Sequence, residues 1–263
     1  MAGFYSREYS YKQRLVSWLS QNANFTYTCR RGVARGLKRK GGLAFLPNFA
    51  QPTAEETFLR GLDLRDKIVF DVGGFMGLMT LLFASRGKRV FTFEPNPEAR
   101  QRIQANLDAN GFDCVTLRGV ALGDRPGKVE LVFDALMAGG ASGDAKVSAE
   151  LRATAAHPRT IEAEVTTLDR EIEAGLPVPD LVKIDVEGME CAVLRGMRNL
   201  LATRKPWVYV ELHGTDGADK QAKASGAINA LREFGYRIYD VERGVYIAPD
   251  DPVTGKESHI FGD

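Results

Sequence analysis

The stretch that decides the fold runs from Lys67 to Pro95 and reads KIVFDVGGFMGLMTLLFASRGKRVFTFEP. An apolar run reaches Asp71 and is followed by three glycines, Gly73, Gly74 and Gly77. A helix-length apolar segment then leads to a second apolar run, which ends at Glu94. This pattern predicts two parallel strands joined through a glycine turn and a helix. Such units bind ligands at the carboxyl ends of their strands, where glycines let the backbone come close.

The ligand predicted for this unit is S-adenosylmethionine rather than a nicotinamide dinucleotide. The dinucleotide fingerprint needs glycines two and then three residues apart, but Phe75 and Met76 interrupt that spacing. Asp71 also places negative charge where a pyrophosphate would have to bind. A carboxylate favours a nearby sulfonium or ammonium group instead. Glu94, at the tip of the next strand, suits two hydrogen bonds from ribose hydroxyls, because an ionised carboxylate only accepts.

Composition is that of an ordinary globular protein. The chain has 263 residues, 44% of them hydrophobic and 26% charged, with a formal net charge of +1. This balance gives no electrostatic reason to expect nucleic acid or a membrane as a partner. The three cysteines share no metal-like spacing, and the N-terminus lacks the apolar core of a signal peptide. We therefore expect a cytoplasmic protein with reduced thiols; an oligomer stays open.

The chain divides into an N-terminal appendage, residues 1–60, and a main domain, residues 61–263. The appendage is expected to contain a helix over Phe4 to Leu19 and a second helix opened by a capping box at Thr53. Between them lies a basic run, Arg30 to Lys40. That run suits a phosphate-bearing substrate or is simply a solvated loop. The appendage is expected to cover the cofactor or shape a substrate pocket.

Further along, the sequence predicts a third strand over Cys114 to Leu122 and another over Lys128 to Phe133. Residues 135–160 are rich in Gly, Ala and Ser and lack a sustained apolar face. We predict a flexible segment there, near the mouth of the active site. A surface insertion without a role is the alternative.

The second informative stretch is DLVKIDVEGME, residues 180–190. Its strand should present Lys183 and Asp185 on one side, because strand side chains alternate. A helix over Met189 to Leu201 follows, and the strand Pro206 to His213 delivers Glu211 and His213 at its end.

The last strands predicted, residues 236–241 and 245–248, are joined by so short a turn that they must be antiparallel. The predicted fold is therefore α/β: a mostly parallel, seven-stranded sheet with an antiparallel last hairpin. This is the Rossmann-like arrangement of class I methyltransferases, preceded here by a helical appendage.

Five motifs resemble the FkbM family of S-adenosylmethionine-dependent methyltransferases. They are DVGGFMG (71–77), FEPNP (93–97), VALGD (120–124), TLD (167–169) and LVKIDVEGMECAVLRG (181–196), the most specific of the set. The resemblance covers roughly residues 53–248. Family members commonly carry Asn where this chain has Phe75, which alters the methionine end of the cofactor pocket.

The resemblance implies methyl transfer to a hydroxyl oxygen of a sugar, polyketide or other small natural product. It also implies a set of cofactor-binding residues: Asp71, Gly73, Gly74, Phe75, Gly77, Glu94, Pro95, Val120, Ala121 and Asp185. Methyl transfer to an amine, carboxylate, peptide or nucleotide-linked substrate remains open. So does a cofactor-binding protein that has lost catalysis.

Candidates for catalysis sit at the ends of two strands. His213 is the first choice as base, because an unperturbed imidazole accepts protons at neutral pH; a hydrogen-bonded structural histidine is the alternative. Asp185, Glu187 and Glu211 are further candidates, and Asp185 is also placed to hold a divalent metal such as Mg²⁺. Lys183 is expected either to pair with an acid or to stabilise a nascent alkoxide. His157 and His259 receive no role.

Overall fold

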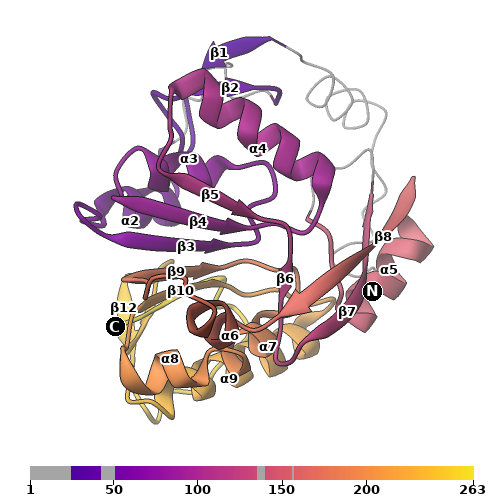
Figure 1. Cartoon of the computed structure of the whole chain (residues 1–263). Helices are drawn as coiled ribbons and strands as arrows, with labels where there is room; N and C mark the ends of the chain where they lie inside the picture. Colours follow the sequence, from indigo (N-terminus) through magenta and orange to yellow (C-terminus); the bar gives the residue numbers. More distant parts are fainter. Residues whose placement is uncertain (1–24, 43–50, 135–139, 156) are drawn as a thin grey trace.

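The computed structural model describes four parts of the chain, residues 25–42, 51–134, 140–155 and 157–263 (Figure 1). The helix expected over Phe4 to Leu19 lies outside these residues.

A mixed, mostly parallel sheet forms the centre of the molecule. Among the described residues its order is β12-β11-β13-β10-β9-β3-β4-β5. The strands from β10 to β5 run parallel, whereas β13, β11 and β12 form antiparallel pairs. Their bounds are β3 (Ile68–Val72), β4 (Arg89–Phe93), β5 (Val115–Arg118), β9 (Leu181–Ile184), β10 (Trp207–Glu211), β11 (Ile238–Asp240), β12 (Val245–Ile247) and β13 (His259–Gly262). The α/β class and the antiparallel end of the sheet are thus confirmed.

The expected count of seven strands is wrong, because the described sheet has eight. The predicted hairpin exists as the antiparallel pair β11 and β12. The strand His259–Gly262, however, enters between β10 and β11 and pairs with both. Its four residues are too short to show a periodicity, so only tertiary pairing reveals it. In this register His259 lies directly opposite Glu211.

Helices cover both faces of the sheet (Figure 1). One face carries α2 (Ala54–Gly61), α3 (Leu78–Ala84) and α4 (Pro97–Asn110); the other carries α6 (Leu168–Glu173), α7 (Glu190–Arg195), α8 (Arg198–Thr203) and α9 (Gly217–Arg232). Val69 packs into the core on the first face and Phe70 into the core on the second. A strand that is buried on both faces has a continuous run of apolar residues, and for this reason β3 and β4 could be predicted from the sequence.

A smaller sheet, of order β6-β8-β7, lies beside the carboxyl ends of the parallel strands (Figure 1). It consists of β6 (Ala121–Leu122), β7 (Gly127–Asp134) and β8 (Pro158–Thr166). The strand expected over Cys114 to Leu122 is therefore wrong as a single element: it divides into β5 of the main sheet and β6 of this one.

The expectation of an unstructured segment over 135–160 is also corrected. Residues 135–139 lie outside the described residues, but α5 (Ala145–Thr154) follows, and β8 starts at Pro158. Asp144 caps α5 by accepting hydrogen bonds from the backbone N–H groups of Lys146 and Val147. This local cap is a helix signal that the Ala- and Gly-rich composition concealed.

The helix expected over Met189 to Leu201 is broken into α7 and α8. Gly196 stands between them, against the backbone of Gly123. A Cβ atom at Gly196 would lie 1.9 Å from the carbonyl oxygen of Gly123. Only glycine allows this approach, by which the smaller sheet joins the helical layer.

The described part of the appendage packs on the main domain. Thr53 and Glu56 form the predicted capping box of α2, and Leu59 belongs to the same core as Val69. The basic run lies in and around a hairpin of β1 (Thr26–Thr28) and β2 (Lys38–Lys40). Asn106 and Asn110 of α4 accept hydrogen bonds from backbone N–H groups of β2. The hairpin is therefore docked rather than a free loop.

Candidate active site

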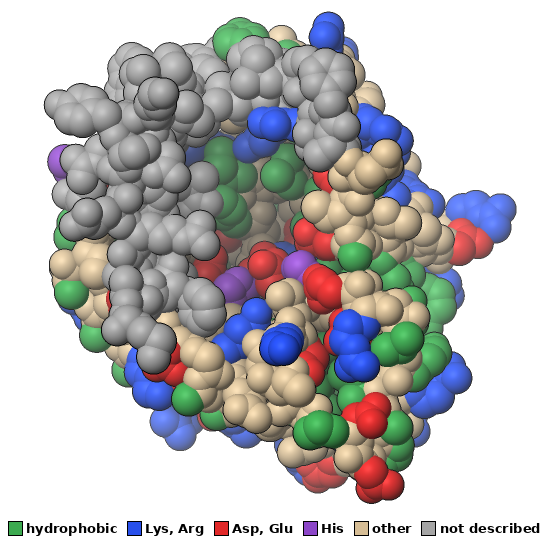
Figure 2. Space-filling view, turned by 180° about the vertical axis from the view of Figure 1, so that it is seen from behind, with side chains coloured by type: hydrophobic (Ala, Val, Ile, Leu, Met, Phe, Trp, Pro, Cys, Tyr) green, Lys and Arg blue, Asp and Glu red, His purple; other side chains and the backbone are tan. Residues whose placement is uncertain are grey.

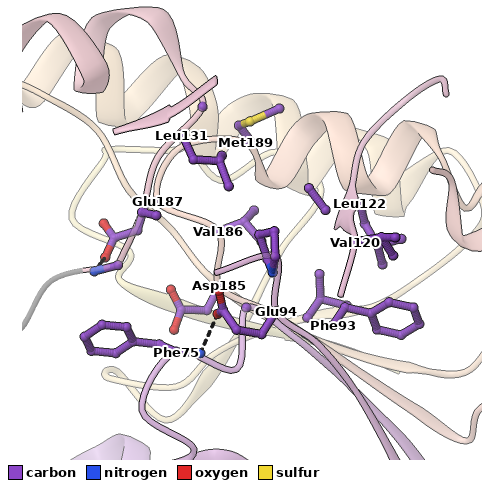
Figure 3. Close-up of a pocket in the computed structure, with 17 residues that line it drawn as sticks. Phe75, Phe93, Glu94, Val120, Leu122, Leu131, Asp185, Val186, Glu187 and Met189 are labelled. Atoms are coloured by element: carbon purple, nitrogen blue, oxygen red, sulfur yellow. Dashed lines mark hydrogen bonds between the residues drawn. The ribbon is translucent and has the colours of Figure 1, made fainter. Parts of the chain in front are cut away.

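A pocket opens at the carboxyl ends of β3, β4 and β9 and is closed by the smaller sheet (Figure 3). It holds about 730 Å³ of empty space, its open mouth included. Its walls are largely apolar, and its acidic side chains are those of Glu94, Asp185 and Glu187. The labelled apolar side chains are Phe75, Phe93, Val120, Leu122, Leu131, Val186 and Met189. A largely apolar wall with a few acidic side chains suits the nucleoside part of a ligand.

The glycine loop after β3 forms one side of the pocket. Gly73 has φ 82°, and a Cβ there would lie 1.8 Å from the carbonyl oxygen of Asp185. Phe75 also has a positive φ, 45°. Asn tolerates this backbone region better than an aromatic residue does. Gly74 and Gly77 do not line the pocket; Gly77 starts α3 in the left-handed conformation.

Glu94 is held in place from two sides. Its Oε2 accepts a hydrogen bond of 2.7 Å from the backbone N–H of Phe75, and its Oε1 accepts one of 2.8 Å from that of Asn96. The side chain is 6% exposed, and burial raises its pKa, against the effect of these two bonds. Each oxygen keeps a lone pair for a further donor. Pro95, Val120 and Ala121 line the pocket beside it.

Asp71 and Lys183 lie beneath the pocket rather than in it. Asp71 is fully buried and accepts a 2.6 Å hydrogen bond from the Thr80 hydroxyl. The Lys183 ammonium lies 3.4 Å from Asp71 and donates to the Gly73 carbonyl and to Asp185. Burial alone would lower the pKa of Lys183, but the charges of Asp185 and Asp71 outweigh it and raise that pKa. Neither Asp71 nor Lys183 lines the pocket. Of the two roles expected of Lys183, the structure shows pairing with acids rather than a position from which to stabilise an alkoxide. Both side chains hold the glycine loop in place.

Beyond Asp185, acidic and histidine side chains gather on the floor of a hollow (Figure 2). His213 Nδ1 lies 3.0 Å from Glu190 Oε1. Its Nε2 faces three carboxylates: Glu211 at 3.5 Å, Glu187 at 3.6 Å and Asp185 at 3.8 Å. The four strand-end residues predicted from sequence are thus brought together.

The role of His213 as a general base stays a prediction, and its surroundings favour the protonated form of the ring. Burial lowers the pKa of the ring, but the contact with Glu190 and the nearby carboxylates of Glu211 and Glu187 raise it well above its ordinary value. Burial raises the pKa of Asp185 to about 7, against the attraction of Lys183.

His259, to which the sequence assigned nothing, belongs to the same region. Its Nδ1 is in close contact with Glu242, and its Nε2 lies 3.7 Å from Glu55 and 3.8 Å from Glu211. Three of these residues come from α2, β10 and β13, and Glu242 lies in the turn after β11. No local pattern in the sequence joins segments that lie so far apart along the chain.

The basic run contributes one buried cation near the glycine loop. Arg39 is 6% exposed, and one of its guanidinium nitrogens lies 3.9 Å from the Met76 sulfur. Whether the run binds phosphate stays a prediction.

Among the described residues, no helix is both long and apolar enough to span a bilayer.

Comparison with known proteins identifies the family. The model of the methyltransferase FkbM domain matches residues 71–238. 31-O-demethyl-FK506 methyltransferase FkbM of Streptomyces tacrolimicus is 31% identical over 233 residues, covering 78% of this chain and 84% of the relative. Hexuronic acid methyltransferase AglP of Haloferax volcanii is 34% identical over 173 residues, covering 63% and 66%. 2-O-methyltransferase NoeI of Sinorhizobium fredii is 28% identical over 188 residues, covering 66% and 74%.

The match to AglP spans just under two thirds of that relative. The activity on hexuronic acid that the name of AglP states is therefore a property of that relative and is not assigned to this chain. The domain match, by contrast, covers most of this chain and includes the end of β3, the glycine loop, Glu94 and β9. The chain belongs to the FkbM family of S-adenosylmethionine-dependent methyltransferases.

Proposed function

We propose that the protein transfers a methyl group from S-adenosylmethionine to a hydroxyl oxygen of a small molecule, a sugar or another natural product. The observation that carries this proposal is the Glu94 carboxylate, held by two backbone N–H groups at the wall of an apolar pocket. Its remaining lone pairs suit the two ribose hydroxyls of the cofactor.

The lining of the pocket offers suitable surroundings for each part of the cofactor. Val120, Ala121 and Pro95 supply an apolar slot beside Glu94 that suits the adenine. Phe75, Asp185 and Glu187 line the other end, where negative charge favours the sulfonium and the ammonium of the methionine part. This arrangement directs the reactive end of the cofactor towards the hollow of Figure 2.

The cofactor supplies an activated methyl group, whose bond to sulfur breaks as the bond to the acceptor oxygen forms. The residues of this chain hold that oxygen in line and take the hydroxyl proton. Asp185 and Glu187 both line the pocket and reach the hollow, so they are the carboxylates best placed for these tasks.

A hydroxyl acceptor is favoured by two of the relatives, whose names specify an oxygen of FK506 and a 2-O position. The carboxylates gathered in the hollow disfavour an anionic acceptor group unless a cation binds with it. The same charge favours an amine, which makes an amine acceptor the second candidate.

The test is methyl transfer from labelled S-adenosylmethionine to a panel of glycosides, uronides, hydroxylated macrocycles, amines and peptides. We expect label in a product that resists mild base, as a methyl ether does and a methyl ester does not. Asp185→Asn should lower the rate, and exposed Glu173→Ala should leave it unchanged. Label only on nitrogen would favour the second candidate, and label only in a base-sensitive ester would overturn both.

A further inference from the structure

The two histidines of the hollow repeat one arrangement. In each ring Nδ1 lies against a carboxylate, Glu190 for His213 and Glu242 for His259. In each ring Nε2 then faces carboxylates that include Glu211. A histidine held in this way by an outer carboxylate presents its other nitrogen as a metal ligand.

Glu211 joins the two halves through different oxygens. Its Oε1 lies 3.5 Å from His213 Nε2, and its Oε2 lies 3.8 Å from His259 Nε2. Two triads of possible ligands result, each with its donor atoms within 4.8 Å of one another: Asp185, Glu211 and His213; and Glu55, Glu211 and His259.

The separations are too long for hydrogen bonds but suit a shared ion. The distances from the two Nε2 atoms to the carboxylate oxygens of the triads run from 3.5 to 3.8 Å, beyond the usual 2.7–3.2 Å range of a hydrogen bond. Two donors that each lie about 2.1 Å from one ion, the length of a Zn²⁺–nitrogen bond, are at most about 4.2 Å apart. Each imidazole nitrogen is therefore close enough to the carboxylate oxygens of its triad to share an ion with them.

An independent sign comes from Tyr209. It shares a face of β10 with Glu211, and its ring stacks on that of His259, with centroids 5.7 Å apart. Its side chain is fully buried, yet the hydroxyl has no hydrogen-bond partner among the described residues. A buried hydroxyl left without a partner beside charged groups points to an ion or an ion-bound water.

We propose that the hollow binds two divalent first-row transition-metal ions, such as Mn²⁺ or Zn²⁺, bridged by the Glu211 carboxylate. One ion is bound by His213 and Asp185, the other by His259 and Glu55. Imidazole ligands favour these metals over Mg²⁺, which takes oxygen ligands almost alone. The metal-binding site is inferred from the positions of the donor atoms. The role of the ions rests on the proposed function: they would hold the acceptor hydroxyl and lower the pKa of that hydroxyl.

The test is the number of ions bound by the chelator-treated full chain, titrated with Mn²⁺ or Zn²⁺ alone by calorimetry. We expect two ions per chain. His213→Ala and His259→Ala should each lose one, and Glu211→Gln should weaken both sites by about 100-fold or more. Glu242→Gln, which removes only an outer partner, should weaken one site about 10- to 100-fold.

The matched control is His157→Ala, which replaces the exposed third histidine and should still bind two ions. Melting of each metal-free variant separates loss of a ligand from loss of the fold. Fewer than two ions in the wild type, or binding that survives Glu211→Gln, would overturn the proposal. Because the titration contains no methyl donor, its result is independent of the methyl-transfer assay.

Discussion

At the scale of single residues, the site depends on charges that are buried and paired. Lys183 is 1% exposed and lies between the carboxylates of Asp71 and Asp185, while its third contact is the carbonyl of Gly73. One ammonium thus fixes the glycine loop and the strand end that line the pocket. The sequence predicted that Lys183 and Asp185 share a side of β9, but burial depth cannot be read from alternation.

Lys183→Met should lower the free energy of unfolding by about 3–5 kcal/mol, because two buried carboxylates lose their cation. The matched control is Lys67→Met, which removes the half-exposed pair with Asp180 and should change stability by less than about 1 kcal/mol. Urea unfolding of both variants measures the difference. Equal effects would show that Lys183 is not the residue that holds this part of the fold.

At the scale of elements, the sequence predicted those helices and strands whose formation depends on residues close to one another in the chain. The strand, glycine loop and helix of residues 68–84 and the capping box at Thr53 all depend on neighbours in sequence. The break between α7 and α8 depends instead on the approach of Gly123 to Gly196. The strand β13 depends on pairing with β10 and β11. Neither contact leaves a periodic signal.

Gly196→Ala should destabilise the protein by about 1–3 kcal/mol, because the added methyl group would overlap the Gly123 carbonyl. Gly217→Ala, at the start of α9 with no atom within 4 Å of the added carbon, should change stability by no more than about 0.5 kcal/mol. Thermal unfolding compares the two. A tolerated Gly196→Ala would mean that the smaller sheet can move away from the helical layer.

At the scale of the whole molecule, the sequence predicted the pocket around Glu94 but only part of the hollow around Glu211. Glu94, Gly73, Phe75 and Asp185 lie within three of the motifs and do converge on one pocket. Glu55 and His259 lie in segments that sequence reasoning treated as appendage and tail. They meet at Glu211 only because α2 packs beside β10 and β13 pairs with it.

The central claim is a cofactor site centred on Glu94, and calorimetric titration with S-adenosylhomocysteine tests it most directly. We expect wild type and the exposed-site control Glu173→Ala to bind alike. Glu94→Ala should bind about 100-fold more weakly or not at all, since two hydrogen bonds to a charged group contribute about 3 kcal/mol or more. Glu94→Gln, which keeps the shape of the side chain, should also weaken binding. Absence of binding by the wild type, or undiminished binding by both Glu94 variants, would contradict the account.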